Sequence, residues 1–235
     1  MTPLAFVTLL GFVRTTDPAG HLMAWRTPTF TLVVGAVLPA GVTREGMLSA
    51  VRGAARTWSE VECSTVTIAV KDSPTRQLAV AKDGVSAVVP HVIAWCADER
   101  GRDCHDSLSP ALTTTRFGAW VGRGPTPIQE ADIEINAVDY RWDDASVPNG
   151  ADLQMILTHE IGHALGLADA CRMPGGPAAV DDAGKPVPEC FTSQAAVRDS
   201  VMWPLGSRTD RGRRRLSDQD RRAVCALYPK KGRRE

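Results

Sequence analysis

Two histidines and a glutamate lie within five consecutive residues of the chain, at His159, Glu160 and His163. Histidines four residues apart project from the same face of a helix, so both imidazoles can bind one metal ion. Two imidazole ligands favour zinc over harder cations such as calcium. Glu160 follows the first histidine and can take a proton from a water molecule without binding the metal itself. This H-E-x-x-H pattern predicts a zinc site that performs hydrolysis.

The residues after this motif strengthen the prediction. Gly166 comes three residues after His163, where a glycine with positive φ ends a helix and turns the chain back. Asp169 comes three residues later, so the turn would bring its carboxylate to the metal from another side. Two histidines and one carboxylate form a competent ligand set for zinc. In the alternative interpretation, Asp169 only supports the helix end, and His91, His105 or a water molecule completes the ligand set.

Three helices are predicted from apolar residues that recur at steps of three and four. The helix that must carry the motif covers residues 152–165, and an earlier amphipathic helix opens at Thr43 and includes Trp58. A short helix follows Ser217 and runs to about residue 227. Ser217 and Asp220 resemble an N-terminal capping box, which marks the start of this last helix.

Five segments rich in β-branched residues are predicted as strands. They cover residues 25–37, 66–70, 85–95, 112–120 and 131–137. Pro90 interrupts the third segment, so we expect that strand to be bent or to lie at a sheet edge, because proline cannot donate to a strand ladder. In the fifth segment Ile133 and Ile135 alternate with polar residues. With a long loop over residues 171–199, these elements predict one α+β domain over residues 22–229.

These segments together resemble a metzincin, the zinc endopeptidase clan whose extended motif is H-E-x-x-H-x-x-G-x-x-H/D, followed by a methionine-containing turn. Residues 200–204 (SVMWP) resemble this Met-turn, and residues 216–229 are similar to the C-terminal helix of matrixins, the family of the matrix metalloproteinases. Residues 57–59 look like the end of the matrixin first helix, and residues 132–142 resemble its acidic strand. Asp169 stands where matrixins have histidine, as in the smaller snapalysin group.

The resemblance implies a zincin-like fold, in which a twisted mixed β-sheet packs with a first helix and an active-site helix, before the Met-turn and a C-terminal helix. It implies a secreted zinc endopeptidase in which Glu160 is the general base and Met202 lies beneath the metal. The implied zinc ligands are His159, His163 and Asp169. The implied edge strand, residues 112–117, pairs with an extended protein or peptide substrate, and later residues wall its side-chain pocket. The substrate-binding residues implied in this way are Leu112, Thr113, Thr114, Pro204 and Leu205.

Two matrixin features have no match in the sequence. No segment before the domain resembles the cysteine switch that keeps matrixins latent. The ligands of the second, structural zinc site also lack a match, because the remaining histidines are scattered along the chain, at His21, His91 and His105. A calcium ion is a further expectation at an acidic stretch, against the alternative of surface acids clustered in a turn; this stretch contains Asp139, Asp143 and Asp144.

The six cysteines are even in number and form no C-x-x-C pair, which favours disulfides in an oxidising compartment over a zinc ribbon or free buried thiols. Two of the pairs would close short loops, and the third pair is what remains. The pairing favoured in this way is Cys96–Cys104, Cys171–Cys190 and Cys63–Cys225. Spacing alone leaves the other connectivities open.

The 235 residues carry 27 basic and 27 acidic side chains, and 43% of them are hydrophobic, as in ordinary folded proteins. The zero net charge argues against a nucleic-acid partner, and we expect a monomer. Basic residues gather after Arg211, and residues 230–235 are predicted to be a solvated basic tail. The apolar run at residues 4–13 is too short to insert stably in a membrane. It predicts a signal-peptide remnant or leader over residues 1–21, and therefore a secreted or periplasmic protein, with an arginine bias that suggests a bacterial gene.

Two other functions compete with an endopeptidase. One is a secreted, non-catalytic binding module that keeps zinc for stability, although the intact Glu160 gives no support for it. The other is a zinc-dependent exopeptidase or amidase, which would share the H-E-x-x-H motif but not the extension to Asp169 or the Met-turn.

Overall fold

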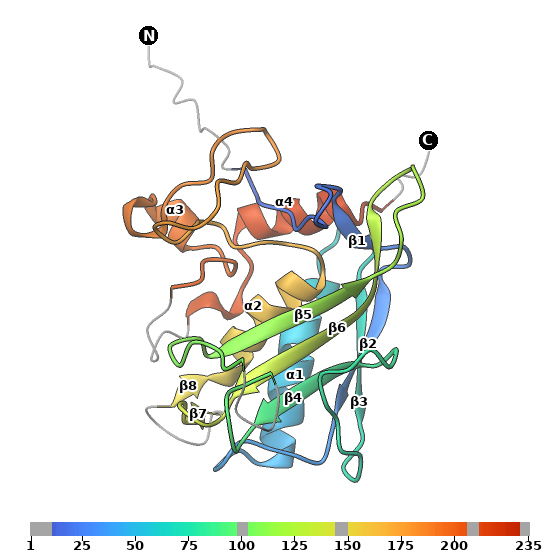
Figure 1. Ribbon diagram of the computed structural model, residues 1–235, viewed down its shortest axis with the longest axis vertical. Coiled ribbons are helices and arrows are strands. Elements are labelled where there is room, and N and C mark those ends of the chain that lie inside the picture. The colour runs from blue at the N-terminus through green and yellow to red at the C-terminus, as the bar shows by residue number, and fades with distance from the viewer. Residues whose placement is uncertain (1–10, 98–102, 144–149, 206–211, 231–235) are drawn as a thin grey trace.

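The computed structural model describes residues 11–97, 103–143, 150–205 and 212–230. Its centre is a six-stranded sheet that is mostly parallel, with β3, β2, β4 and β6 side by side (Figure 1). Strand β1 pairs in parallel with the start of β6, and β5 pairs antiparallel with the rest of β6. The strands are β1 (Met23–Trp25), β2 (Thr29–Val34), β3 (Thr67–Asp72), β4 (Ser86–His91), β5 (Ala111–Phe117) and β6 (Thr126–Asn136). A small second sheet joins β7 (Trp142–Asp143) to β8 (Ala151–Asp152).

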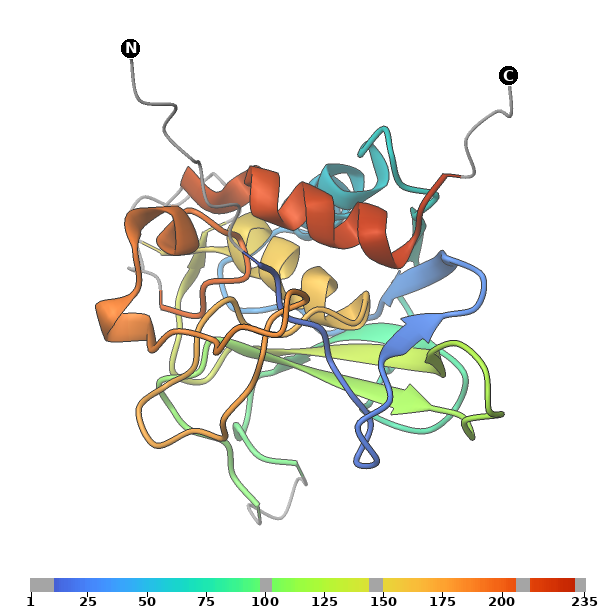
Figure 2. The ribbon, with the colours of Figure 1, turned by 90° about the horizontal axis from the view of Figure 1, so that it is seen from above.

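Two long helices cover one face of the sheet. Figure 2 shows α1 (Arg44–Ser59) and α2 (Leu153–Ala164) on this face, with α4 (Asp218–Leu227) over α2 on the side away from the sheet. The short α3 (Ala195–Arg198) lies in the long loop between α2 and α4. Trp58 is fully buried between the two long helices and donates its indole N–H to the backbone oxygen of Thr158 at 2.8 Å. The architecture is therefore mixed α/β and is compatible with the α+β prediction.

The helices begin where their sequences predict. Thr43 caps α1 by accepting the Gly46 amide at 2.9 Å, and Asp152 caps α2 by accepting the Met155 amide at 3.0 Å. The capping box predicted at Ser217 is present at the start of α4. Each cap satisfies an amide that has no partner inside the helix, which is why these residue types recur at helix starts.

The strands differ from the predicted segments in extent, and β6 starts at Thr126 instead of residue 131. The segment over residues 25–37 is divided, because β1 ends at Trp25 and β2 starts only at Thr29. The expectation that Pro90 places its strand at an edge is wrong, since β4 lies between β2 and β6. The last residue of β4 that pairs with β2 is Val88, so at Pro90 the strand has a neighbour on the β6 side only. The missing N–H of the proline therefore breaks no ladder with β2.

The polar face of β6 is buried. Asp132 is fully buried and accepts the amides of Ala87 at 3.0 Å and Ala81 at 3.3 Å. Glu130, also buried, accepts the amides of Asp83 and Gly84. The loop before β4 therefore closes over this face through carboxylates. Burial raises the pKa of Asp132 to about 6, although the two amides oppose the rise.

Three disulfides form the pairs that the loop lengths favour, Cys63–Cys225, Cys96–Cys104 and Cys171–Cys190. Such bonds are typical of proteins in oxidising compartments, as in the extracellular space. Among the described helices, none has the length and apolar character needed to cross a bilayer.

Residues 11–21, assigned to a leader by the sequence analysis, pack onto the domain in the structure. The Thr15 amide donates to Gly166 O at 2.9 Å, and the Ala168 amide donates to Val13 O at 3.0 Å. Phe12 and Val13 are buried. The ordered domain therefore includes residues before the predicted boundary at residue 22. The rest of that leader, residues 1–10, and residues 231–235 of the predicted basic tail lie outside the described part of the chain.

Candidate metal centre

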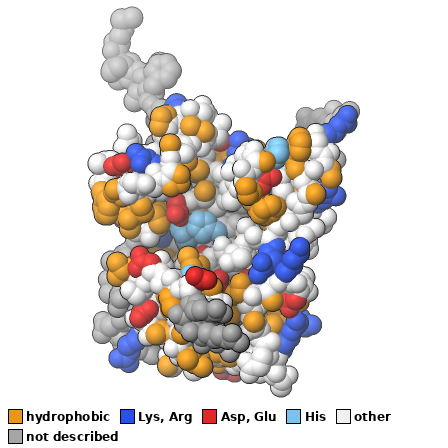
Figure 3. Space-filling model, in the orientation of Figure 1, with side chains coloured by type: hydrophobic (Ala, Val, Ile, Leu, Met, Phe, Trp, Pro, Cys, Tyr) orange, Lys and Arg blue, Asp and Glu red, His pale blue; other side chains and the backbone are white. Residues whose placement is uncertain are grey.

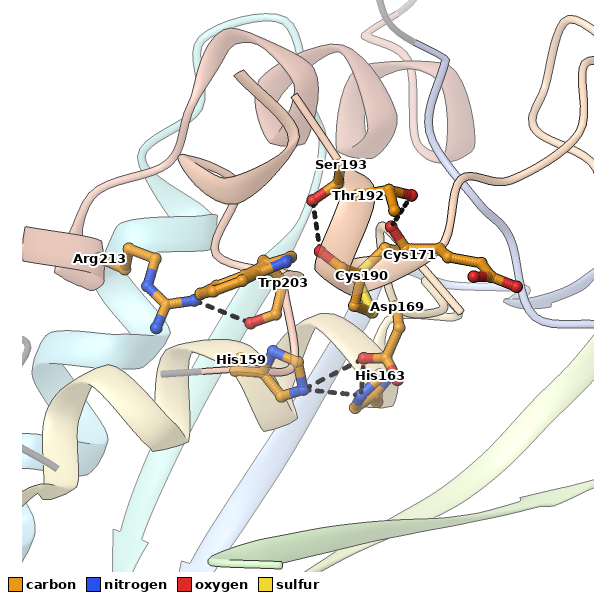
Figure 4. Close-up of a disulfide and its surroundings, with 10 residues drawn as sticks. His159, His163, Asp169, Cys171, Cys190, Thr192, Ser193, Trp203 and Arg213 are labelled. Atoms are coloured by element: carbon orange, nitrogen blue, oxygen red, sulfur yellow. Dashed lines mark hydrogen bonds and ion pairs between the residues drawn. A yellow bond between two sulfur atoms is a disulfide. The ribbon is translucent and has the colours of Figure 1, made fainter. Parts of the chain in front are cut away.

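Three side chains that could bind a metal ion converge at the C-terminal half of α2. His159 and His163 lie one turn apart with their Nε2 atoms 3.0 Å from each other, and the Oδ1 atom of Asp169 lies 3.4 Å from both (Figure 4). Within the described ranges, this is the group of three His, Cys, Asp or Glu side chains close enough together to bind one ion. The three residues predicted as zinc ligands are therefore brought together.

The hydrogen bonds of the two imidazoles determine which nitrogen faces the centre. His159 Nδ1 lies 2.8 Å from Val201 O, and His163 Nδ1 lies 2.9 Å from Leu167 O. A carbonyl oxygen only accepts, so each Nδ1 carries the proton and each Nε2 of a neutral ring presents a lone pair to the centre. These lone pairs and the carboxylate oxygen repel one another unless a metal ion or an added proton lies between them. Asp169 Oδ1 is buried without a hydrogen-bond partner, which fits the same requirement.

The electrostatics of the site favour positive charge. Burial by itself lowers the pKa of His163, but the nearby carboxylate of Asp169, with the charge of Glu160, raises it to about 9. Burial by itself raises the pKa of Asp169, yet the net shift is downward because His163 and His159 stabilise the carboxylate. Both shifts arise because negative carboxylates lie close to the imidazoles. The same negative charge would attract a bound cation.

A sharp turn after α2 places Asp169. The amides of Gly166 and Leu167 donate back to His163 O at 2.9 Å and Gly162 O at 3.0 Å, which is the Schellman pattern of a helix end. Gly166 has a φ of +94°, as predicted for this position, and a Cβ there would lie 2.5 Å from Met23 O. Glycine is therefore required both for the backbone angle and for the close approach of β1.

Two further contacts hold the loop that carries Asp169. The Ala170 amide donates to Met202 O at 2.8 Å, which joins this loop to the predicted Met-turn. The Cys171–Cys190 disulfide closes the chain just beyond it, as Figure 4 shows. The carboxylate is thus positioned by α2 on one side and by a covalent bond on the other.

The turn containing Met202 packs against α2. A Cβ added to Gly162 would lie only 2.2 Å from Met202 Sδ, so the sulfur contacts the helix backbone between the two histidines. The turn is fixed from behind by Asp220, whose Oδ1 accepts the Ser200 hydroxyl at 2.5 Å and whose Oδ2 accepts the Val201 amide at 3.0 Å. Sequence reasoning identified Asp220 only as a helix cap. Its second role has no local signal, because the turn it holds lies some 20 residues upstream.

A cleft of about 600 Å³ runs past the three ligands. Figure 3 shows histidine side chains in a hollow of this face, with acidic and hydrophobic side chains beside them. Four of the five residues implied as substrate-binding line the cleft, namely Leu112, Thr113, Pro204 and Leu205. Thr114 lies on the other face of β5, where its hydroxyl donates to Glu134 Oε1 at 3.2 Å.

One wall of the cleft contains a residue that the sequence did not predict to bind substrate. Trp203 lines it, and the Arg213 guanidinium lies over the indole ring, 4.9 Å from the ring centroid. Arg213 also donates to Trp203 O at 2.8 Å. This cation–π contact gives the wall a rigid apolar surface with a positive charge at its rim.

Glu160 lies on α2, directly after His159. Its side chain is buried on α2 and lines the cleft. The hydroxyl of Thr113 on β5 lies 2.6 Å from Glu160 Oε2. The predicted general base is thus in the cleft with the three ligands, in contact with the edge strand.

The alternative ligands His91 and His105 lie elsewhere. Their Nε2 atoms are 2.9 Å and 3.6 Å from one buried oxygen, Oε2 of Glu134, and Trp95 contacts both rings. Burial raises the pKa of Glu134, but the hydrogen bond and charge of His91, with the charge of His105, lower it overall. The alternative in which one of these histidines completes the ligand set with His159 and His163 therefore does not fit the structure. Although they are far apart in the sequence, His91 and His105 meet at one carboxylate in the fold.

The remaining histidine, His21, and Asp139 of the expected calcium site have protein partners. His21 Nδ1 lies 3.1 Å from Asp17 Oδ2, and its ring stacks on Trp120. Asp139 accepts the side-chain amide of Asn136 at 3.0 Å. Of the two other residues in the expected calcium site, Asp143 is buried in β7 and Asp144 lies outside the described residues.

No protein-family model matches the chain, and no curated protein sequence matches it.

Proposed function

We propose that this protein is an exported zinc endopeptidase of the metzincin type. The observation that carries the proposal is the meeting of His159, His163 and Asp169 beside a buried glutamate in one cleft. Nδ1-protonated imidazoles and an unpartnered carboxylate oxygen are the donor set expected for zinc. The three disulfides agree with export from the cell.

The chain's own residues divide the chemistry between them. His159, His163 and Asp169 would hold the zinc ion, which when bound polarises a carbonyl oxygen and lowers the pKa of water toward roughly 7. Glu160 takes one proton from the attacking water as the water oxygen bonds to the peptide carbonyl carbon. Glu160 then gives this proton to the leaving nitrogen as the C–N bond breaks, which regenerates its carboxylate.

The substrate in this proposal is an extended peptide segment. Strand β5 pairs with β6 along one side, so its other side is the edge next to the cleft. Such an edge offers backbone N–H and C=O groups to an added strand. Leu112 and Thr113 would lie along this peptide, while Pro204 and Leu205 would contact one of its side chains. A central position in a chain fits this arrangement better than a terminus, which supports an endopeptidase over an exopeptidase.

The deciding experiment replaces Glu160 by glutamine, which preserves size but cannot take a proton. In the Glu160→Gln variant we expect zinc content to stay near that of the wild type. Cleavage of casein or of a diverse peptide library should fall by about 100-fold or more, as for the loss of a general base. Glu62→Gln, at an exposed glutamate, is the matched control.

Each contrary outcome identifies a competing function. Retained cleavage by Glu160→Gln would show that another group is the base. A wild-type protein that binds zinc but cleaves nothing would be a binding module, and release of terminal residues alone would identify an exopeptidase.

A further inference from the structure

The carboxylate of Glu160 has one partner among the described residues. Thr113 Oγ1 lies 2.6 Å from Glu160 Oε2, and it also lies 3.1 Å from the backbone oxygen of the same residue. A threonine hydroxyl has one proton to donate, and the shorter contact is to the charged oxygen. The hydroxyl therefore holds Oε2, and Oε1 has no hydrogen bond from the described part of the chain.

The position of Thr113 follows from the strand that carries it. Strand β5 is antiparallel to β6, with Thr113 opposite Ile133 in the register. Because side chains alternate along a strand, Thr113 faces α2 whereas Thr114 faces Glu134 on the other side. A shift of one residue would exchange the two threonines, so the pairing register decides which hydroxyl meets Glu160.

We propose that Thr113 is a positioning residue for Glu160, an inference that rests on the proposed function. By occupying Oε2, the hydroxyl holds the carboxylate in one rotamer and leaves Oε1 to take the proton of the attacking water. The same oxygen then returns the proton to the leaving amine. The β-branched side chain is itself restricted at χ1, so the hydroxyl is presented with little loss of entropy. This role also joins the substrate-binding edge to the base, since Thr113 belongs to β5 and Glu160 belongs to α2.

The test compares Thr113→Val, which replaces the hydroxyl by a methyl group of similar size, with Thr113→Ser, which keeps the hydroxyl. For Thr113→Val we expect kcat to fall about tenfold with KM changed less than about twofold, as for the loss of a hydrogen bond to a charged group. Thr113→Ser should recover most of the lost kcat. Zinc content and Tm should stay near wild-type values in both variants. Thr75→Val makes the same exchange at an exposed threonine outside the cleft, and it should leave kcat and KM near their wild-type values.

A second readout does not depend on turnover. Acetohydroxamate binds zinc and shares its ionisable proton with a nearby carboxylate, so its Kd reports where the Glu160 carboxylate lies. We expect Thr113→Val to raise this Kd by about the same factor as the loss in kcat, and Thr113→Ser to restore it. Thr75→Val should leave it unchanged.

Several results would overturn the inference. These are a wild-type kcat and hydroxamate Kd in Thr113→Val, a defect in KM alone, no recovery in Thr113→Ser, or an equal loss in Thr75→Val. If Glu160→Gln is inactive while Thr113→Val is unimpaired, the proposed function stands and the positioning role fails. If the wild type cleaves nothing, the proposed function fails, and the hydroxamate comparison alone decides the role of Thr113. A protein that binds neither zinc nor hydroxamate overturns both proposals.

Discussion

The Oδ1 atom of Asp169 and the Nε2 atoms of His159 and His163 form a triangle. Asp169 Oδ1 is 3.4 Å from each imidazole Nε2 and has no hydrogen-bond partner. A carboxylate in this place offsets more of the charge of a divalent ion than an imidazole would. The H-E-x-x-H motif predicts the first two candidate ligands from spacing alone, whereas the position of the third depends on how the chain turns at Gly166.

At this scale we predict the effect of removing the carboxylate. Asp169→Ala should weaken zinc binding by more than about 100-fold, beyond the loss typical of residues that only support a ligand. Asp169→His should recover binding, because imidazole is also a zinc ligand. Zinc affinity measured by competition with a chelator decides the matter, with Asp199→Ala at an exposed position as the control. Unchanged affinity in Asp169→Ala would show that the residue only supports the loop.

At the scale of elements, local signals located the helices better than the strands. Caps and apolar spacing lie within one segment, so α1, α2 and α4 start at the predicted residues. The order of the strands depends on pairing between distant segments. The prediction that Pro90 places β4 at a sheet edge is wrong for this reason. Whether the missing N–H of the proline breaks a ladder depends on where the pairing with β2 ends. The contact between α2 and the Met-turn also joins distant segments. A glycine at position 162 does not by itself predict that Met202 fills the space beside it.

The Gly162→Ala variant shows which of two opposing effects on the free energy of unfolding is larger, the contact with Met202 or helix propensity. Propensity favours alanine in a helix by about 1 kcal/mol. The new Cβ would meet Met202 Sδ at 2.2 Å and Trp58 at 3.0 Å in a closed core, so we expect a net loss of about 1–3 kcal/mol in the free energy of unfolding. Urea denaturation measures it.

The control is Gly53→Ala on α1, where the Cβ would meet only the end of the Gln154 side chain. That side chain can move, so Gly53→Ala should be neutral or stabilising. Equal stability of the two variants would show that Met202 yields easily.

At the scale of the whole molecule, covalent bonds join segments that are far apart in sequence. Cys63–Cys225 connects the segment after α1 to α4 and spans 162 residues, while Cys96–Cys104 spans eight. Residues 11–17 add non-covalent contacts, because they form hydrogen bonds with the loop that carries Asp169. The two ends of the described chain therefore both brace the half of the domain that holds the site.

Loop length predicts how much each disulfide stabilises the fold. Replacing Cys63 and Cys225 together by serine should lower the free energy of unfolding by about 5 kcal/mol, because the freed loop is long. The matching change at Cys96 and Cys104 should cost only about 2–3 kcal/mol on the same chain-entropy basis. Denaturant unfolding at a fixed zinc concentration compares the two. A larger loss for the short loop would contradict an entropic origin.

The features that the sequence alone predicts are those in which the interacting residues lie within a few positions of one another. Histidines one helical turn apart, a glycine that must take a positive φ, and a serine three residues before its capping partner are all of this kind. Other features come from packing between segments that no periodicity relates. Thr113 meets Glu160 across 47 residues, Asp220 holds the Met-turn, and Glu134 gathers two histidines from β4 and the following loop. Such contacts depend on strand register and on the closure of loops over the sheet, so only the tertiary structure decides them.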